Sequence, residues 1–305
     1  MSPGNSSNPS DGHFACRCGD PLFSFDALPL EDRGRTDFQG HPMNANTTRR
    51  EALATMSLAM SAGMSMTAWN TASADTVGLT TLPTGASLLR ALTLSLTKTP
   101  RRRDFKSVPM ILTRPEEWDA EALTAILSYK GGPKQAFDNT ELEGPWLNLM
   151  RNSMNAQVWS WKHPDFLCVS VTHGTAHLAL YDDFIWDKYQ FAKLTKNKLE
   201  SNTLARLPAA AASDPFDFQK ADGLYSPAAN SIPVLQRRGA VFVACHNQVW
   251  EITAGRIQAG VNPDRLSHEA LAAEFTNHLI ADVVLSPGAI GTLPELLLKG
   301  FTYAK

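Results

Sequence analysis

The chain has 305 residues, of which 43% are hydrophobic and 19% are charged, and its formal net charge at pH 7 is −2. This balance is typical of a globular protein and excludes both a disordered chain and one that crosses a membrane repeatedly. Because 28 Lys and Arg residues are matched by 30 Asp and Glu residues, the chain lacks the basic excess of a nucleic-acid-binding protein. Four cysteines are too few for a disulfide scaffold in a chain of this length.

Residues 1–42 are rich in Gly, Ser, Pro and Asp and show no hydrophobic periodicity. We interpret them as a disordered extension, or as an artefact of the translation start if synthesis begins at Met43. Cys16 and Cys18 lie in this extension without the further ligands that a metal or redox motif needs.

Residues 43–74 have the three parts of an export signal. Arg49 and Arg50 form a basic start, an uncharged stretch rich in Ala, Met and Ser follows over 52–68, and Ala72-Ser73-Ala74 has the pattern of a cleavage site. A polar residue before the two arginines and an apolar residue shortly after them resemble the twin-arginine consensus. We therefore expect a cleaved signal, a periplasmic protein, and the twin-arginine translocase as its partner during export.

Two alternatives stay open for this signal segment. It could be an amphipathic helix of the folded domain, although its apolar residues surround the helix instead of keeping to one face. It could also be a single membrane anchor, although it is short and interrupted by Gly and Ser for a span of ~20 apolar residues. Residues 75–103, which follow it, are predicted to be a linker in which the arginines at 101–103 form a solvated turn.

From residue 104 to residue 305 the sequence alternates strand-like and helix-like stretches. Short apolar runs predict strands over 108–113, 166–171, 240–244, 283–285 and 301–304. Helix-like spacing or composition predicts helices over 116–129, from 174 to 194, and over 232–238, 268–280 and 290–299. Residues 205–230, with an alanine run and several Pro, Gly and Asp residues, predict a surface excursion. The alternation predicts one α/β domain with a mostly parallel sheet and helices on both faces.

In such sheets ligands bind outside the carboxyl ends of the strands, so the residues that end the predicted strands are candidate site residues. They are Arg114, His173, Gly174, Cys245, His246, Asn247, Ser286 and Gly288. Cys245 is the candidate catalytic residue, because nearby N–H groups and a histidine can stabilise a nucleophilic thiolate. The others are candidate ligand-binding residues. Cys168 lies in the middle of a strand and is predicted to be an inert core residue, and a purely apolar role stays open for Cys245 as well.

Three stretches resemble segments of the DsrE-like family, and they occur in that family's order. FLCVSVTHGTAHLAL resembles its apolar strand followed by His-Gly, IPVLQRRGAVFVACHNQV its helix, glycine, strand and cysteine, and VVLSPGAIGTLPELLLKGFTYAK its carboxy-terminal unit. The resemblance spans 104–305 and implies an α/β domain of three layers, flavodoxin-like in layout, that forms homo-oligomers. It also implies that sulfur is carried as a persulfide on Cys245 and that a sulfur donor or acceptor protein is a partner.

The sequence departs from that family in its export signal, in the residues that follow the cysteine, and in an insertion over 195–230. Two alternatives therefore stay open. One is a non-catalytic binding or structural module. The other is a metal-binding protein that uses His173 and His177, which would share one face of an α-helix. The sequence has no Gly-rich phosphate loop, Ser-His-Asp order or paired-carboxylate motif, so we expect no cofactor and no nucleic-acid partner.

The carboxy-terminal unit is more apolar than one buried helix face requires. Its large apolar residues are Leu293, Leu296, Leu297, Leu298, Phe301 and Tyr303. Burial of apolar area is worth about 25 cal/mol per Å², so an exposed stripe of this kind favours self-association. We expect a homo-oligomer, and the alternative is that both sides of this helix are covered within one subunit.

Overall fold

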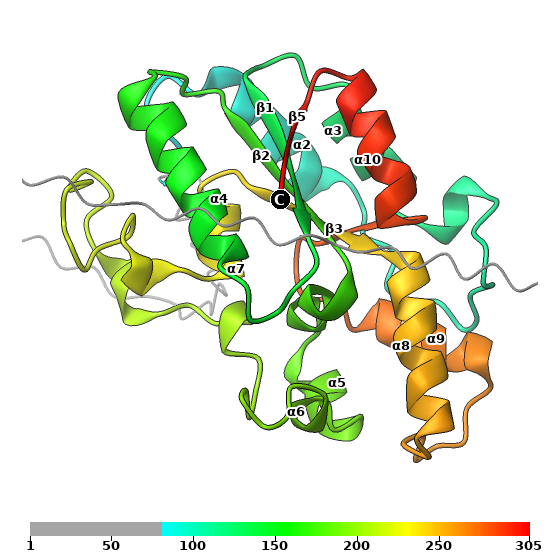
Figure 1. Cartoon of the computed structure of the whole chain (residues 1–305). Helices are drawn as coiled ribbons and strands as arrows, with labels where there is room; N and C mark the ends of the chain where they lie inside the picture. The colour runs from blue at the N-terminus through cyan, green and yellow to red at the C-terminus, as the bar shows by residue number, and fades with distance from the viewer. Residues whose placement is uncertain (1–80) are drawn as a thin grey trace, which may run out of the picture. The chain divides into compact units, whose positions relative to one another are not determined.

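The computed structural model describes residues 81–305, and the extension and signal predicted over 1–42 and 43–74 lie outside the described residues. Five strands form one parallel sheet in the order β4-β3-β2-β1-β5 (Figure 1). They are β1 (Lys134–Asn139), β2 (Leu167–Thr172), β3 (Val241–Cys245), β4 (Val284–Ser286) and β5 (Thr302–Ala304). The α/β class predicted from the sequence is confirmed.

Every residue of β2, β3 and β4 is buried, because helices cover both faces of the sheet. One face packs against α4 (Trp146–Asn155), α5 (Asp183–Lys188), α6 (Phe191–Leu194), α7 (Ile232–Arg237), α8 (His246–Gln258) and α9 (His268–Asn277). The opposite face packs against α2 (Ser87–Lys98), α3 (Ala120–Leu127) and α10 (Ala289–Leu298). None of these helices, all within residues 81–305, is long and apolar enough to cross a bilayer.

The chain crosses the sheet in one direction from β1 to β4 and then returns to place β5 beside β1. Connections between parallel strands are right-handed in nearly all proteins. A right-handed return in the reverse direction must pass over the opposite face, and α10 does so. Flavodoxin has the strand order 2-1-3-4-5, so this sheet shares its three layers but not the order of its strands.

The first strand lies elsewhere than the sequence predicts. Residues 108–113 are irregular chain, and Met110 and Ile111 within them are 54% and 65% exposed. β1 was missed because its sequence, KQAFDN, has only two apolar residues, Ala136 and Phe137, which face opposite sides of the sheet. The other four predicted strands are confirmed with ends that differ by at most one residue.

The helices differ from the prediction in two places. The predicted linker over 75–103 contains α2, whose Leu89, Leu92 and Leu96 are spaced at i, i+3 and i+7 and enter the core, so that prediction is wrong for its 12 residues. The helix α8 was not predicted, because its first three residues, His246, Asn247 and Gln248, are polar. The helices predicted over 232–238, 268–280 and 290–299 are confirmed as α7, α9 and α10.

Two further stretches are helical in a more broken way than predicted. The helix expected over 116–129 is a 3-10 turn, Pro115–Glu117, followed by α3. The stretch from 174 to 194 is a 3-10 helix, Gly174–Leu180, followed by α5 and α6. The excursion predicted over 205–230 is confirmed as turns and short 3-10 segments, and part of it forms a separate small apolar cluster with α7.

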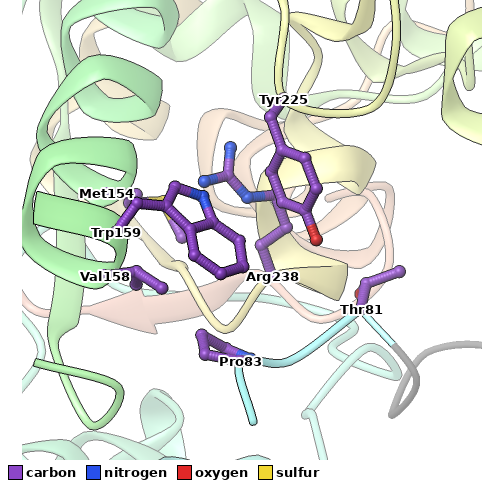
Figure 2. A pocket seen from close by; sticks show the side chains of 7 residues that line it. All are labelled: Thr81, Pro83, Met154, Val158, Trp159, Tyr225 and Arg238. Carbon is purple, nitrogen blue, oxygen red and sulfur yellow. The ribbon is translucent and has the colours of Figure 1, made fainter. Parts of the chain in front are cut away.

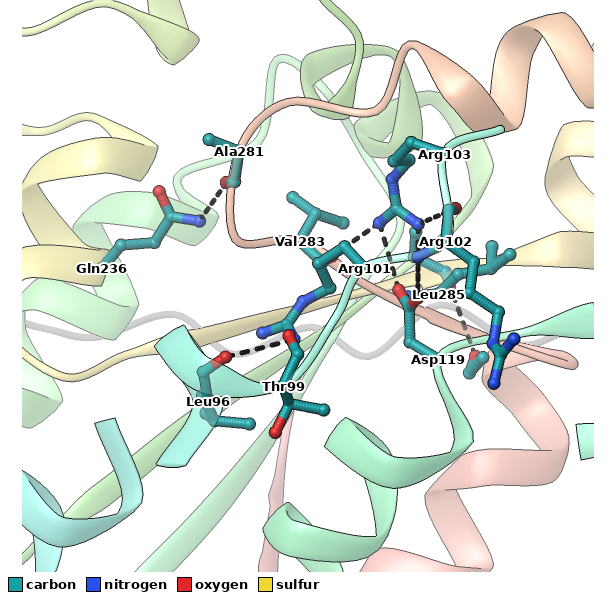
Figure 3. Close-up of polar contacts among 12 residues, drawn as sticks. Leu96, Thr99, Arg101, Arg102, Arg103, Asp119, Gln236, Ala281, Val283 and Leu285 are labelled. Atoms are coloured by element: carbon teal, nitrogen blue, oxygen red, sulfur yellow. Dashed lines mark hydrogen bonds and ion pairs between the residues drawn. The ribbon is translucent and has the colours of Figure 1, made fainter. Parts of the chain in front are cut away.

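The arginines at 101–103, predicted as a solvated turn, instead join the chain after α2 to the sheet (Figure 3). Asp119, which is 2% exposed, accepts hydrogen bonds from Nη2 of Arg103 at 3.1 Å and from the backbone N–H of Leu285 at 2.7 Å. Its other carboxylate oxygen accepts the backbone N–H of Arg102 at 2.9 Å. Asp119 therefore connects three segments, namely the arginine triplet, the start of α3 and strand β4.

Replacement of Asp119 by alanine is expected to lower the free energy of unfolding by about 3 kcal/mol, because the largely buried Arg103 guanidinium loses its carboxylate and the buried Leu285 N–H loses its acceptor. Urea denaturation followed by circular dichroism measures this loss. The matched control is Glu143→Gln, which breaks an exposed ion pair with Lys198 and should cost less than about 1 kcal/mol. Equal losses in the two variants would show that Asp119 does not join these segments.

Candidate functional site

Cys245 is the last residue of β3 and lies at the carboxyl edge of the sheet. Its sulfur accepts the backbone N–H of Ala289, the first residue of α10, at 3.2 Å. Cys245 is also the residue that directly precedes α8. Two helices therefore begin at this sulfur, and the N-terminus of a helix favours a negative charge placed against it.

Burial opposes the formation of a thiolate at Cys245. The residue is 5% exposed and belongs to the apolar core formed with α2, α3 and α10. Burial raises the pKa of the Cys245 thiol, and the backbone N–H groups of Ala289, Gln248 and Asn247 reverse only part of that rise. The neutral thiol therefore dominates at pH 7, and the N–H groups are placed to stabilise the charge when the proton leaves.

Cys168 differs from Cys245 in its place along the strand, in its face of the sheet and in its complete burial. It lies in the middle of β2, is fully buried, and packs on the opposite face of the sheet. Complete burial raises its pKa. Its predicted place in the core is confirmed. Both cysteines are free thiols.

A second group of polar side chains lies at the same edge, on β1, β2 and β5. Nε2 of His173 is 2.7 Å from Oδ1 of Asp138, and Oδ2 of Asp138 accepts the Tyr303 hydroxyl at 2.8 Å. The hydrogen bond to Asp138 raises the pKa of Tyr303. Asp138 is 9% exposed, so its carboxylate is held by these two partners in a largely desolvated position. An imidazole oriented by a carboxylate in this way can accept and return a proton.

The alternation of side chains along the strands places both groups on one face of the sheet. Cys245 shares its face with Val169 and Val171 of β2, and His173 is two residues further along the same extended chain. Ala136, two residues before Asp138, belongs to that face too. The thiol and the imidazole therefore belong to neighbouring strands and to the same side, the side covered by α10.

His177 lies between the ends of β2 and β3. Its Nε2 accepts the backbone N–H of Cys245 at 3.1 Å, so this nitrogen must carry a lone pair. Burial lowers the pKa of His177 to about 3, so the ring is neutral at physiological pH. His177 therefore holds the backbone of the cysteine, and it does not supply a positive charge to the sulfur.

The metal-binding alternative depended on an α-helical spacing that the structure does not have. His177 lies in a 3-10 helix, with three residues per turn, so residues four apart do not share a face. Nε2 of His173 and Nε2 of His177 each have a different partner. Within residues 81–305, no group of three or more His, Cys, Asp or Glu side chains is arranged to hold a metal ion.

The remaining predicted site residues fall into two groups. Gly174 and Asn247 lie close to the cysteine. The N–H of Gly174 donates to Oε1 of Gln248 at 2.8 Å, and its φ of +55° together with the closeness of the Thr140 carbonyl requires a glycine. The side chain of Asn247 lies against Gly288, where an added Cβ would be 2.9 Å from its Nδ2.

The others are occupied by structural contacts. The hydroxyl of Ser286 is buried and donates to the Ala244 carbonyl, and the buried ring of His246 is 2.8 Å from the Pro109 carbonyl. Burial lowers the pKa of His246, so it is not the cation that the sequence offered for the thiolate. Arg114 does not end a strand, because 108–113 is not one. Its exposed guanidinium pairs with Glu117 instead.

Sequence reasoning missed Asp138, Tyr303 and Gln248. Asp138 was missed together with β1, and Tyr303 was counted only as an apolar residue of the terminal unit. One signal could have found Asp138: Asp138-Asn139 follows Ala136-Phe137 and precedes Thr140, which is a short apolar pair that ends in polar residues.

The fold and this edge define an α/β protein with a free cysteine at the carboxyl edge of a five-stranded parallel sheet. No protein-family model, no curated protein and no solved structure matches the chain.

Alkylation with iodoacetamide is expected to modify Cys245 before Cys168 in the folded protein, because only Cys245 has any exposed surface. Because its pKa is raised, the rate should continue to increase with pH above about 9.5, where an ordinary cysteine with a pKa of about 8.5 approaches its plateau. Peptide mass spectrometry at several pH values measures both effects. Equal protection of the two thiols until denaturation would make Cys245 a core residue.

Proposed function

We propose that this chain carries a sulfane sulfur as a persulfide on Cys245, as its resemblance to the DsrE-like family implies. The observation that carries the proposal is the hydrogen bond from the first N–H of α10 to the Cys245 sulfur, at the carboxyl edge where α/β proteins bind their ligands. The three backbone N–H groups around this sulfur suit a thiolate or a persulfide anion better than a buried neutral thiol.

The transfer that this proposal requires is an exchange between two sulfur atoms. The Cys245 thiolate attacks the outer sulfur of a donor persulfide, R–S–SH, so that a new S–S bond forms and the donor bond breaks. The donor leaves as R–S⁻, and Cys245 becomes Cys–S–SH. No external oxidant or reductant is consumed, because the oxidised sulfur atom moves from one thiol to the other.

The small exposure of Cys245 limits what can reach it. A side chain that is 5% exposed keeps a bulky protein thiol away unless α10 moves, so we propose a small persulfide as the donor. The raised pKa also makes transfer depend on loss of the thiol proton. His173, held by Asp138 on the same face of the sheet, follows Thr172, which pairs with Ala244 beside Cys245, and we propose it as the base for this step.

Incubation with a small organic persulfide is expected to add one sulfur atom to Cys245, seen as a mass increase of about 32 Da on its peptide. Cys245→Ser should abolish the adduct, and the matched control Cys168→Ser should retain it. An adduct that survives in the Cys245→Ser protein, or no adduct in the wild type, would exclude persulfide carriage. The second outcome would favour the alternative of a non-catalytic binding or structural module.

The periplasmic location, and export by the twin-arginine translocase, belong to the same proposal. They rest on Arg49, Arg50 and the Ala72-Ser73-Ala74 site, which lie outside the described residues. An oxidising compartment converts exposed thiols to disulfides or sulfenic acids. A sulfur carrier exported there gains from a cysteine as enclosed as Cys245.

We also propose that the chain forms a homo-oligomer through α10. The inner side of α10 is buried within the subunit at Leu293 and Leu296, and so is Phe301, which follows the helix. On its outer side Ile290, Leu297 and Leu298 are 63%, 41% and 79% exposed, and their spacing of i, i+7 and i+8 places them on one face. β5, which lies at the edge of the sheet, adds the half-exposed Tyr303 beside them.

Leu298→Glu is expected to reduce the oligomer to a monomer, because it places a charge in the centre of this apolar face without touching the core. Light scattering at micromolar concentration measures the mass. Phe216→Glu is the matched control, since Phe216 is 81% exposed in the excursion over 205–230 and its replacement should leave the mass unchanged. A wild-type protein that is monomeric in this measurement would rule out the oligomer.

A further inference from the structure

Two buried arginines lie at the amino end of the sheet, away from Cys245. Arg238 follows α7 directly and precedes β3, and it is 4% exposed. Arg151 lies on α4 and is 7% exposed. A buried guanidinium is costly unless an anionic partner balances its charge.

The protein partners of these two guanidinium groups are neutral. Nη2 of Arg238 donates to Oδ1 of Asn155 at 2.6 Å, and its guanidinium stacks 4.8 Å from the centre of the Tyr225 ring. Nη1 of Arg151 donates to the Tyr225 carbonyl at 2.8 Å, and Nη2 donates to Asn148 at 2.7 Å. Within residues 81–305, no carboxylate forms an ion pair with either arginine.

Three buried donors in this cluster have no acceptor among the described residues: Nη1 of Arg238, Nε of Arg151 and Nε1 of Trp159. All three are N–H groups, so they cannot satisfy one another. Burial, together with the smaller effect of the positive charge on Arg151, lowers the pKa of Arg238 to about 10, so Arg238 stays protonated at neutral pH. The cluster therefore has excess positive charge and excess donors together.

A small cavity adjoins two of the residues that carry these donors, Arg238 and Trp159. Trp159, Tyr225 and Arg238 line it together with Pro83 and Val158, and Figure 2 shows the Arg238 side chain together with the Trp159 and Tyr225 rings. The two rings are 5.5 Å apart and nearly perpendicular. The centre of a water-sized particle can occupy about 10 Å³ of this cavity, so the space is somewhat larger than one water molecule and has room for a single small ion.

We infer that Arg238, with Trp159 beside it and Arg151 behind it, binds one small monovalent anion of the size of a halide. The charge selects an anion, the unpaired N–H groups supply its hydrogen bonds, and the volume excludes a phosphate or a larger organic acid. Tyr225 closes the site, because its hydroxyl donates to the Pro215 carbonyl and fixes the ring over the guanidinium. The anion joins α4, α7 and the excursion over 205–230.

This anion site is independent of the sulfur chemistry proposed for Cys245. Cys245 ends β3 at the carboxyl edge, whereas Arg238 stands before the first residue of that strand. The anion is therefore a structural ligand of the amino end of the sheet, and its loss should loosen the excursion that carries Tyr225.

Equilibrium dialysis of the purified full-length protein against radiolabelled chloride tests the inference. The expected result is saturable binding of one chloride per chain, with sulfate failing to compete. Trp159→Phe keeps the ring stack but removes one N–H donor, and it should weaken chloride binding about tenfold or more. Arg238→Gln should abolish binding. The matched control is Arg206→Gln, an exposed arginine paired with Asp183, which should bind chloride as the wild type does.

The melting temperature supplies a second readout that does not depend on the stability of the Arg238 variant. Chloride should raise it above the value in gluconate at equal ionic strength, and this increment should shrink in Trp159→Phe and persist in Arg206→Gln. Absence of saturable chloride binding by the wild type would overturn the inference. Unchanged binding by Trp159→Phe together with Arg238→Gln would overturn it as well.

Discussion

The return of the chain from β4 to β5 determines most of what is distinctive in this protein. Because parallel connections are right-handed, a return in the reverse direction must cross the face that the earlier connections left to α2 and α3. This crossing places the first N–H of α10 on the Cys245 sulfur and brings Tyr303 of β5 to the Asp138 carboxylate. It also leaves the outer side of α10 exposed at the edge of the sheet.

The same crossing creates the conflict at Cys245. The helix that supplies an N–H group to the sulfur also covers it, so the environment that favours a thiolate electrostatically disfavours it by removing water. Burial has the larger effect, because the pKa of the thiol is raised. A carrier of a small, oxidisable sulfur species gains from this balance, since an enclosed thiol that ionises only on reaction is protected between turnovers.

Buried charges have different kinds of partner at two places in the molecule. Asp119 and Arg103 balance each other and are surrounded by backbone partners, so their burial joins three segments of chain. Arg238 and Arg151 have neutral partners. Each of them, and Trp159 as well, carries one buried N–H donor without an acceptor among the described residues. The first arrangement is complete within the subunit, whereas the second needs an anion from solution to be complete.

The sequence by itself determined the α/β class, four of the five strands and most of the later helices, because apolar runs such as 240–244 and helical spacing such as 268–280 are local signals. It also determined which cysteine ends a strand and which lies in the middle of one. The tertiary structure alone decided that 108–113 is not a strand, that 134–139 is one, and that Asp138 and Tyr303 lie beside His173. These facts depend on pairing between residues distant in the chain, and β1 is a strand because β2 and β5 bond to it on both sides, whatever the apolar content of KQAFDN.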